Sequence, residues 1–302
     1  MTTTEELVTL DDGVRLRTWT LGSPKPDMPP IVCVHGGPGL PDYLAPVAEM
    51  IMDLSTVHHY DQRGVGGSGW VGEHTIARHV RDLELLLDAW GYDRVTLIGH
   101  SYGTDLVTFF LLAHPDRVAG VVYLAGPFVG PWRAPTKAAE RARRSPAQQD
   151  RLAELAAVDS RTDDEEIEFL TLSWFPDHAD RNRAWDWARA AAESLRPINY
   201  RMNVQLNTDK RVTPLESQVG RLRASLPAQT MIIGGAEDPR PASFLQALGI
   251  RIGCEVAIIA DAGHQPWLEQ PAEFRTLLRA AVSPQTSRMS PENDVTDGRL
   301  PS

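Results

Sequence analysis

A Gly-x-Ser-x-Gly motif, GHSYG at residues 99–103, places a serine where it could act as a nucleophile. A serine hydroxyl attacks carbonyl carbons poorly until a base within hydrogen-bond reach removes its proton. In acyl transfer that base is a histidine, and a carboxylate fixes its tautomer and stabilises its charged form. If Ser101 carries out this chemistry, an acid and a histidine must follow it in the chain.

Both partners are present downstream of the motif. Asp238 lies in GGAEDPRP and His264 lies in ADAGHQPW, and each segment follows an apolar run. The order serine, acid, histidine is one of the known orders of a catalytic triad. Glu237 is an adjacent alternative to Asp238, which we prefer because it fits a Gly-x-x-Asp-x-x-Pro spacing from Gly235 to Pro241. This set predicts nucleophilic acyl transfer.

Acyl transfer also needs backbone amides aimed at the oxyanion of the tetrahedral intermediate, and each donor contributes about 3 to 4 kcal/mol. The amide of Tyr102, directly after the serine, is one candidate. The second should come from HGGPG at residues 35–39, where Gly36 and Gly37 allow the backbone to turn its amides inward. We favour Gly37 as this second donor.

The residues around the serine motif favour a strand, a tight turn and a helix. Val95–Ile98 is an apolar run before the motif, and Leu106–Ala113 is a second one after it. In such a nucleophile elbow the serine projects from the apex with backbone angles that suit a non-glycine residue poorly. Gly99 and Gly103 then have a steric reason, since a Cβ at either position would collide with the neighbouring strand or helix.

The rest of the chain alternates short apolar runs with amphipathic stretches. We expect strands at residues 7–10, 14–21, 31–34, 56–60, 95–98, 118–124, 230–233 and 256–259, and helices around 76–90, 106–113, 242–248 and 271–282. Strands that alternate with helices at this spacing predict an α/β fold with a doubly wound, mostly parallel sheet.

The pattern changes between residues 128 and 226, which are rich in arginine and alanine and read as helical. We expect this segment to form an α-helical cap inserted into the sheet core, which comprises residues 1–127 and 227–282. Residues 283–302 are polar and contain proline, serine, asparagine and aspartate. We expect this last segment to be disordered.

Composition narrows the possible partners. The formal net charge of -10 and the pI near 5.4 disfavour binding to nucleic acid or to an anionic membrane. The first residues lack a signal-peptide pattern and no apolar run reaches membrane-spanning length, so we expect a cytoplasmic protein. The two cysteines lie in or beside apolar runs and are expected to be inert thiols, and we expect neither a metal nor a cofactor.

Five segments together resemble the α/β-hydrolase superfamily: HGGPG, DQRGVGGS, GHSYG, GGAEDPRP and AGHQPW. HGGPG with DQRG is most similar to the proline iminopeptidase branch, whose members release N-terminal proline and related residues. The resemblance covers roughly residues 14–128 and 228–282. It implies the same nucleophile, acid, base and oxyanion amides: Ser101, Asp238, His264, Gly37 and Tyr102. It also implies that Asp61 and Arg63 form a scaffold under the oxyanion loop, without a catalytic role.

In that branch, glutamates of the cap bind the α-ammonium of the substrate. The comparable stretches here read WDWA at 185–188 and INYRMN at 198–203, and neither contains a glutamate. A buried ammonium needs a carboxylate partner, because an unpaired charge taken out of water costs several kcal/mol. Asp186 or Glu216 could substitute. The altered cap otherwise favours an ester or lactone over a peptide.

Other cap residues are candidates for substrate binding. The aromatic ones, which could line an apolar pocket or pack the cap onto the sheet core, are Trp174, Phe175, Trp185, Trp187 and Tyr200. Arg201 could pair with a substrate carboxylate or lie on a solvated face.

We therefore expect a cofactor-free serine hydrolase that acts through an acyl-enzyme on a small molecule or short peptide. The resemblance implies an aminopeptidase, and an esterase, lactonase or thioesterase is the alternative. A lyase, a cofactor-free oxygenase or a slow ligand-binding receptor would be non-hydrolytic uses of the same site. Haloalkane and epoxide hydrolysis are disfavoured because both need a carboxylate in place of Ser101. The sequence does not indicate an oligomeric state.

Overall fold

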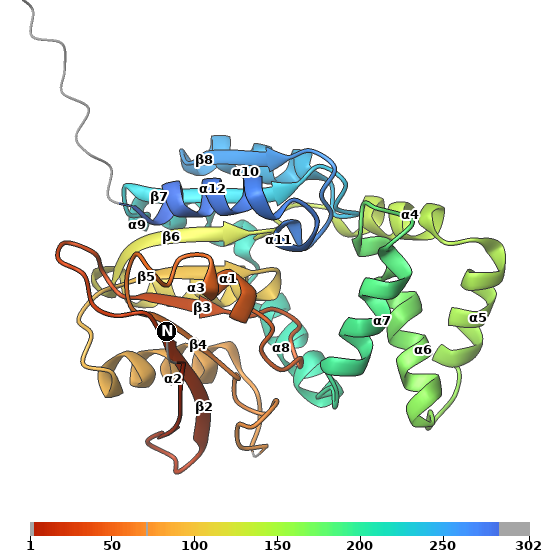
Figure 1. The fold of residues 1–302 in the computed structure, drawn as a ribbon, viewed down its shortest axis with the longest axis horizontal. Helices are drawn as coiled ribbons and strands as arrows, with labels where there is room; N and C mark the ends of the chain where they lie inside the picture. The colour runs from red at the N-terminus through yellow and green to blue at the C-terminus, as the bar shows by residue number, and fades with distance from the viewer. Residues whose placement is uncertain (1–2, 71, 284–302) are drawn as a thin grey trace, which may run out of the picture.

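An eight-stranded sheet forms the centre of the protein, with helices on both of its faces (Figure 1). The computed structural model describes residues 3–70 and 72–283. Residues 284–302, nearly all of the segment expected to be disordered, lie outside the described residues. No helix among the described residues is long and apolar enough to cross a bilayer.

The sheet has the order β1-β2-β4-β3-β5-β6-β7-β8. Its strands are β1 (Thr4–Thr9), β2 (Arg15–Leu21), β3 (Ile31–Val34), β4 (Val57–Tyr60), β5 (Val95–His100), β6 (Val118–Leu124), β7 (Gln229–Gly235) and β8 (Glu255–Ile259). β2 is antiparallel to both of its neighbours, and the other adjacent pairs are parallel. The predicted mostly parallel α/β sheet is confirmed.

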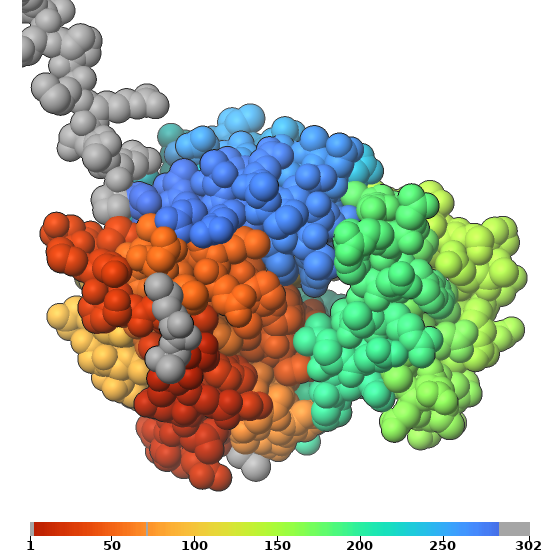
Figure 2. All heavy atoms as spheres, in the orientation of Figure 1, coloured from red at the N-terminus to blue at the C-terminus, as the bar shows by residue number. Residues whose placement is uncertain are grey.

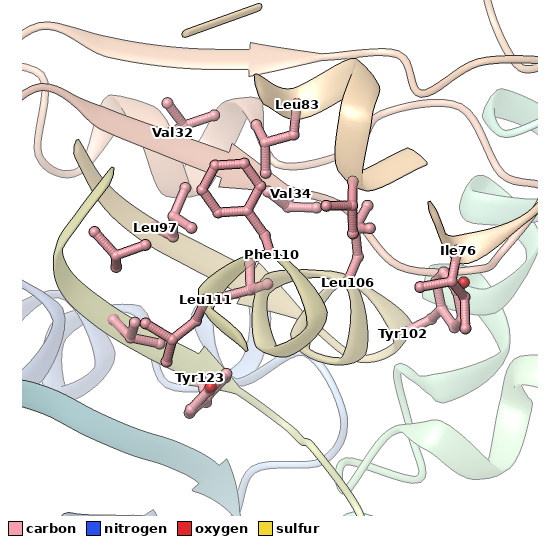
Figure 3. Close-up of a cluster of buried hydrophobic side chains, with 14 of the residues drawn as sticks. Val32, Val34, Ile76, Leu83, Leu97, Tyr102, Leu106, Phe110, Leu111 and Tyr123 are labelled. Carbon is pink, nitrogen blue, oxygen red and sulfur yellow. The ribbon is translucent and has the colours of Figure 1, made fainter. Parts of the chain in front are cut away.

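The central strands are apolar along their length because helices cover them on both sides. Every residue of β3, β4 and β5 is buried, as expected for parallel strands inside an α/β sheet. Helix α3 (Tyr102–Ala113) packs Leu106 and Phe110 toward Val34 and Leu97 on one face (Figure 3). This packing fixes the helix that follows the serine motif against the strands that precede it.

Twelve helices are found in the described residues. They are α1 (Ala45–Glu49), α2 (Ile76–Ala89), α3, α4 (Arg133–Arg143), α5 (Pro146–Ala156), α6 (Asp163–Trp174), α7 (Ala184–Ser194), α8 (Tyr200–Val212), α9 (Val219–Ser225), α10 (Ala242–Ile252), α11 (Pro266–Glu269) and α12 (Pro271–Val282). Sequence patterns predicted α2, α3, α10 and α12. They missed α1 and α11, which have five and four residues and are too short to display a helical period.

The segment predicted as a cap has two parts. Helices α4 to α7 stand away from the sheet beyond the end of β6, and Figure 2 shows a hollow where their green atoms meet the orange and blue atoms of the core. Helices α8 and α9 return to the core, where Met202, Leu206 and Leu222 are buried in the same apolar cluster as Phe110. The outlying part, α4 to α7, therefore faces the carboxyl ends of the parallel strands.

Candidate active site

Ser101 occupies a strained turn between β5 and α3. Its backbone angles are φ 53° and ψ -120°, a conformation that costs of order 1–3 kcal/mol in a non-glycine residue. The Ser101 amide donates a hydrogen bond of 2.9 Å to the carbonyl of Leu124, and its carbonyl accepts one of 3.0 Å from the amide of Thr104. These bonds hold the serine at the apex of the turn.

The two glycines of the motif are needed for close approach. A Cβ at Gly99 would lie 2.7 Å from the carbonyl oxygen of Gly103. A Cβ at Gly103 would overlap the carbonyl oxygen of Val34 and lie 2.7 Å from that of His35. Because real Cβ atoms do not approach backbone this closely, the steric reason predicted for both glycines is confirmed.

Asp238 and His264 meet at the carboxyl ends of two neighbouring strands. Asp238 follows β7, His264 follows β8, and their Oδ2 and Nδ1 atoms are 2.6 Å apart. Burial alone would raise the pKa of Asp238, but its interactions with His264 and Arg240 hold that pKa well below its usual range. An ionised Asp238 therefore holds the proton of His264 on Nδ1, which leaves Nε2 available as a base.

The alternative acid, Glu237, points elsewhere. Its side chain is 55% exposed and pairs with Arg143 of α4 at 3.4 Å. The other oxygen of the Asp238 carboxylate, Oδ1, accepts hydrogen bonds from the Arg240 amide at 2.9 Å and from its guanidinium at 3.1 Å. Arg240 also pairs with Asp177 at 2.8 Å. Asp238 is thus held in one orientation from both sides.

Ser101 and His264 line one chamber, called here the first chamber, with a volume of about 100 Å³. Its other walls include the cap residues Trp174, His178 and Leu195. No hydrogen bond joins the side chains of Ser101 and His264 among the described residues. Such bonds commonly tighten only when a substrate enters, so the shared chamber is the relevant geometric relationship.

The segment at residues 35–39, called here the oxyanion loop, lies beside Ser101. Gly37 has φ 123° and lines the first chamber. The amide of Gly36 already donates a hydrogen bond of 2.9 Å to the hydroxyl of Tyr43. Within the described chain, the amides of Gly37 and Tyr102 donate to no protein group, so both are open to a ligand oxygen.

A second chamber, of about 140 Å³, adjoins Ser101 on another side. It shares Gly37, Ser101 and Arg240 with the first chamber. Its own walls are formed by Pro38, Tyr102, Asp105, Phe128, Trp132, Arg133, Asn207 and Lys210. A substrate bound at Ser101 can therefore extend in two directions.

His100 links the oxyanion loop to the loop of His264. The Nδ1 atom of His100 is 2.7 Å from the Tyr43 hydroxyl, and its Nε2 is 2.9 Å from the carbonyl oxygen of His264. Burial lowers the pKa of His100 well below its ordinary value. A neutral ring accepts the Tyr43 proton on Nδ1 and donates from Nε2. No role was predicted for His100 or Tyr43 from the sequence.

Glu269 joins the same loop to the cap. Its carboxylate accepts hydrogen bonds from the amides of Gly263 at 2.5 Å and Ala179 at 2.7 Å. The amide of His264 donates to the carbonyl of Asp177 at 2.7 Å. The segment that carries the candidate base is therefore fastened to the cap segment that lines the first chamber.

The predicted scaffold residues lie near the oxyanion loop but do not pair with each other. Asp61 accepts hydrogen bonds of 2.8 Å from the amides of Asp42 and Gly67. Arg63 forms a bidentate pair with Asp82, with two bonds of 2.8 Å. Both side chains are buried and hold backbone segments together.

The cap residues predicted to bind substrate line neither chamber: Trp185, Trp187, Tyr200 and Arg201. Trp187 packs on His178, with ring centroids 5.4 Å apart, and the Tyr200 hydroxyl donates to Glu166. Among the five aromatic candidates of the cap, Trp174 is the one that reaches the first chamber.

The two carboxylates proposed as ammonium partners are also elsewhere. Asp186 is exposed on α7, and Glu216 pairs with Arg251 at 2.6 Å on the surface.

Residues 29–271 match the protein family described as alpha/beta hydrolase fold. This match spans well over half of the 302 residues. The chain belongs to the α/β-hydrolase fold family. Its mostly parallel sheet, its strand-turn-helix serine motif and the acid and histidine loops occupy the places expected in that fold.

Curated relatives of this α/β hydrolase match parts of it. A proline iminopeptidase from Saccharolobus solfataricus is 35% identical over 101 residues, which are 32% of this chain and 33% of the relative. Epoxide hydrolase A from Mycobacterium tuberculosis is 35% identical over 146 residues, which are 46% of this chain and 44% of the relative. The chain thus matches less than half of the length of either relative. The predicted resemblance to proline iminopeptidases is confirmed.

Solved structures share its fold at low identity. A structure described as an N-acyl homoserine lactone degrading enzyme has a TM-score of 0.68 at 22% identity and covers 91% of this chain and 99% of its own. The proline iminopeptidase of Mycobacterium smegmatis has a TM-score of 0.66 at 20% identity, with coverages of 92% and 97%. At these identities the similarity shows the fold alone.

Proposed function

We propose that the protein is a serine hydrolase that forms an acyl-enzyme on Ser101. The observation that carries this proposal is the 2.6 Å contact between His264 and Asp238 beside a strained serine in the same chamber. A carboxylate of lowered pKa that holds the Nδ1 proton leaves Nε2 of the histidine to accept the serine proton. Membership of a hydrolase family supports the same reaction class.

The reaction proceeds in two halves. Ser101 Oγ attacks the substrate carbonyl carbon while Nε2 of His264 takes its proton, and the oxyanion is stabilised by the amides of Gly37 and Tyr102. His264 then gives the proton to the leaving group, which departs as the acyl-enzyme forms. In the second half a water loses a proton to His264 and attacks the acyl carbon, and His264 then returns the proton to Ser101 Oγ as the acid product leaves.

We propose a small ester or lactone as the substrate. The first chamber is small and has apolar walls at Leu40, Trp174 and Leu195, which suit a short acyl group or ring. The two carboxylates that line the chambers already carry partners: Asp177 pairs with Arg240 and Asp105 with Lys210. A substrate ammonium would have to displace one of these cations.

An aminopeptidase is the second candidate, because several curated relatives carry the name proline iminopeptidase. The Trp-rich helix α7 and the start of α8 would then have to supply an ammonium site in a different arrangement of the cap.

A paired assay separates the two candidates: p-nitrophenyl acetate and butyrate against proline p-nitroanilide, with Ser101→Ala as the blank. We expect ester turnover with an initial burst, abolished in Ser101→Ala, and little release from the proline amide. Faster specific turnover of the proline amide would favour the aminopeptidase. The absence of a burst and of turnover with every acyl substrate would point to a lyase or a ligand-binding protein instead.

A further inference from the structure

We propose that the second chamber beside Ser101 binds a carboxylate carried by the substrate, through Arg133 and Lys210. This inference rests on the proposed function for its placement at a reacting serine, and it specifies the substrate class of that site. The chamber shares Gly37 and Ser101 with the first chamber, so a group that enters it is attached close to the carbonyl under attack.

The first observation is a buried ion pair in the chamber wall. Lys210 of α8 pairs with Asp105 in the first turn of α3, and their side chains are 15% and 6% exposed. Burial raises the pKa of Asp105, and Lys210 and Arg133 both lower it. Arg133 is therefore close enough to act on the same carboxylate. The chamber is lined by Asp105, Lys210 and Arg133, and because Lys210 pairs with Asp105, the charge of Arg133 is left without a partner there among the described residues.

Arg133 is the cation that remains for a ligand. It is exposed, its guanidinium lies 4.5 Å from the ring centroid of Trp132, and within the described chain it forms no ion pair. Stacking on an aromatic ring holds a guanidinium in place and leaves its edge open. That edge presents parallel N–H groups in the geometry that a carboxylate accepts.

The helix that begins at Arg133 adds positive potential at the same place. Helix α4 has Trp132 as its N-cap, no side-chain cap and no acidic residue in its first turn. The positive end of a helix dipole favours a nearby anion. Trp132 and Arg133 both line the second chamber, so this end of α4 adjoins it.

Arg240, the third cation that lines the second chamber, supplies no free positive charge for a ligand. Arg240 is paired with both Asp177 and Asp238, so two carboxylates more than balance its charge. The whole chain has a formal charge of -10, so an arginine without an ion pair in the described chain, beside the nucleophile, is an exception to the surrounding field. An anionic substrate would be attracted to that point and repelled elsewhere.

Two kinds of ester place a carboxylate in this chamber. One is a half-ester of a dicarboxylic acid, whose carboxylate is on the acyl side, and the other is an ester of a hydroxy acid, whose carboxylate leaves with the alcohol. Both present the same anion to Arg133 and Lys210, and turnover experiments distinguish them.

Binding is tested without turnover by calorimetric titration of Ser101→Ala with benzoate and with neutral benzamide. We expect benzoate to bind about 10-fold more tightly, as expected for one charge contact at a partly exposed site, and to lose this advantage in about 1 M salt. Combining Arg133→Gln with Ser101→Ala should remove the preference for benzoate over benzamide. The matched control is Lys137→Gln, an equal charge change one turn further along α4 on an exposed residue that lines neither chamber.

Turnover then assigns the side of the carboxylate. Mono-p-nitrophenyl glutarate is compared with p-nitrophenyl butyrate, and 3-acetoxybenzoate with its methyl ester, each in the natural protein, Arg133→Gln and Lys137→Gln. In the natural protein we expect one anionic ester to have a higher kcat/KM than its neutral partner. In Arg133→Gln the ratio of these two kcat/KM values should fall about 10-fold.

Three results would overturn this inference. One is equal binding of benzoate and benzamide, and another is an unchanged preference in Arg133→Gln. The third is tighter binding of benzylammonium than of either, which would assign the chamber to a cation through Asp105. If both anionic and neutral esters fail to react while benzoate still binds through Arg133, the proposed hydrolysis is wrong and the carboxylate site stands.

Discussion

The Nε2 atom of His100 donates a hydrogen bond of 2.9 Å to the carbonyl oxygen of His264. The residue directly before the candidate nucleophile thus holds the loop that carries the candidate base. Because the other nitrogen of His100 accepts from Tyr43, whose oxygen accepts from Gly36, one chain of hydrogen bonds spans the site from the oxyanion loop to the base.

Breaking this chain should reduce the rate and leave substrate affinity nearly unchanged. Tyr43→Phe removes the acceptor of the Gly36 amide and the donor to His100, so the oxyanion loop and the His264 loop lose their common tie. We expect kcat to fall roughly 10- to 100-fold with KM within about a factor of two, as for a small misplacement of catalytic groups. Steady-state kinetics with p-nitrophenyl butyrate check this, and an unchanged kcat would show that the chain of bonds positions nothing.

Asp238→Asn should disable the base without unfolding the protein. An amide in place of the carboxylate can stabilise the wrong tautomer of His264, and in a known triad this change lowers kcat by about 10⁴-fold. Glu237→Gln is the control, because this neighbour is exposed and pairs with Arg143 on the surface. If Glu237→Gln had the larger effect on kcat, the acid would be assigned to the wrong residue.

Sequence patterns predicted most of the sheet, since apolar runs such as those of β3 and β5 carry their own signal. Helix α12 has the bounds expected from its amphipathic pattern, Pro271–Val282. The short helices α1 and α11 gave no pattern. The local motifs also pointed to Asp238 and His264, which the structure brings within 2.6 Å of each other.

Contacts between residues that are far apart in the chain could not be predicted from local motifs or apolar runs. Arg133 and Lys210 are 77 residues apart in the chain, and only the packing of α8 near α3 and the start of α4 brings them to one chamber. The roles of His100 and Glu269 likewise depend on backbone atoms of distant loops. A linear motif holds no information on such contacts.

The close approach at the elbow predicts opposite results for two glycines. Gly103→Ala places a Cβ against the carbonyl oxygen of Val34, which would have to move. We expect a loss of about 3 kcal/mol or more in the free energy of unfolding, together with loss of activity. Gly220→Ala on α9 meets no atom within 4 Å and should stabilise the protein by about 0.5 to 1 kcal/mol. Urea denaturation measures both, and similar effects of the two substitutions would contradict the steric account.

Two buried histidines should make the protein less stable as the pH falls. Burial lowers the pKa of His58 and of His178 to about 4, from an ordinary value of 6.5. Both rings are therefore neutral in the folded protein at pH values where the unfolded chain is already protonated. The contribution of the two rings to the free energy of unfolding is complete above pH 6.5 and is lost as the pH falls toward 4. The loss is roughly 3 kcal/mol for each ring.

Urea denaturation between pH 8 and pH 4.5 tests this dependence, and His58→Phe should show a shallower decline than the natural protein. Its absolute stability is not the readout, because the substitution also removes the hydrogen bonds of His58 to Thr20 and Tyr92. Equal free energies of unfolding at pH 7 and pH 5 would show that neutral, buried histidines do not make stability depend on pH.

The most direct test of the central claim is intact-protein mass spectrometry after rapid mixing with p-nitrophenyl acetate. We predict a transient gain of one acetyl group that peptide mapping places on Ser101, absent in Ser101→Ala and long-lived in His264→Ala if any forms. Hydrolysis with no acetyl adduct at any time, or an adduct on another residue that survives in Ser101→Ala with full activity, would contradict nucleophilic catalysis by Ser101.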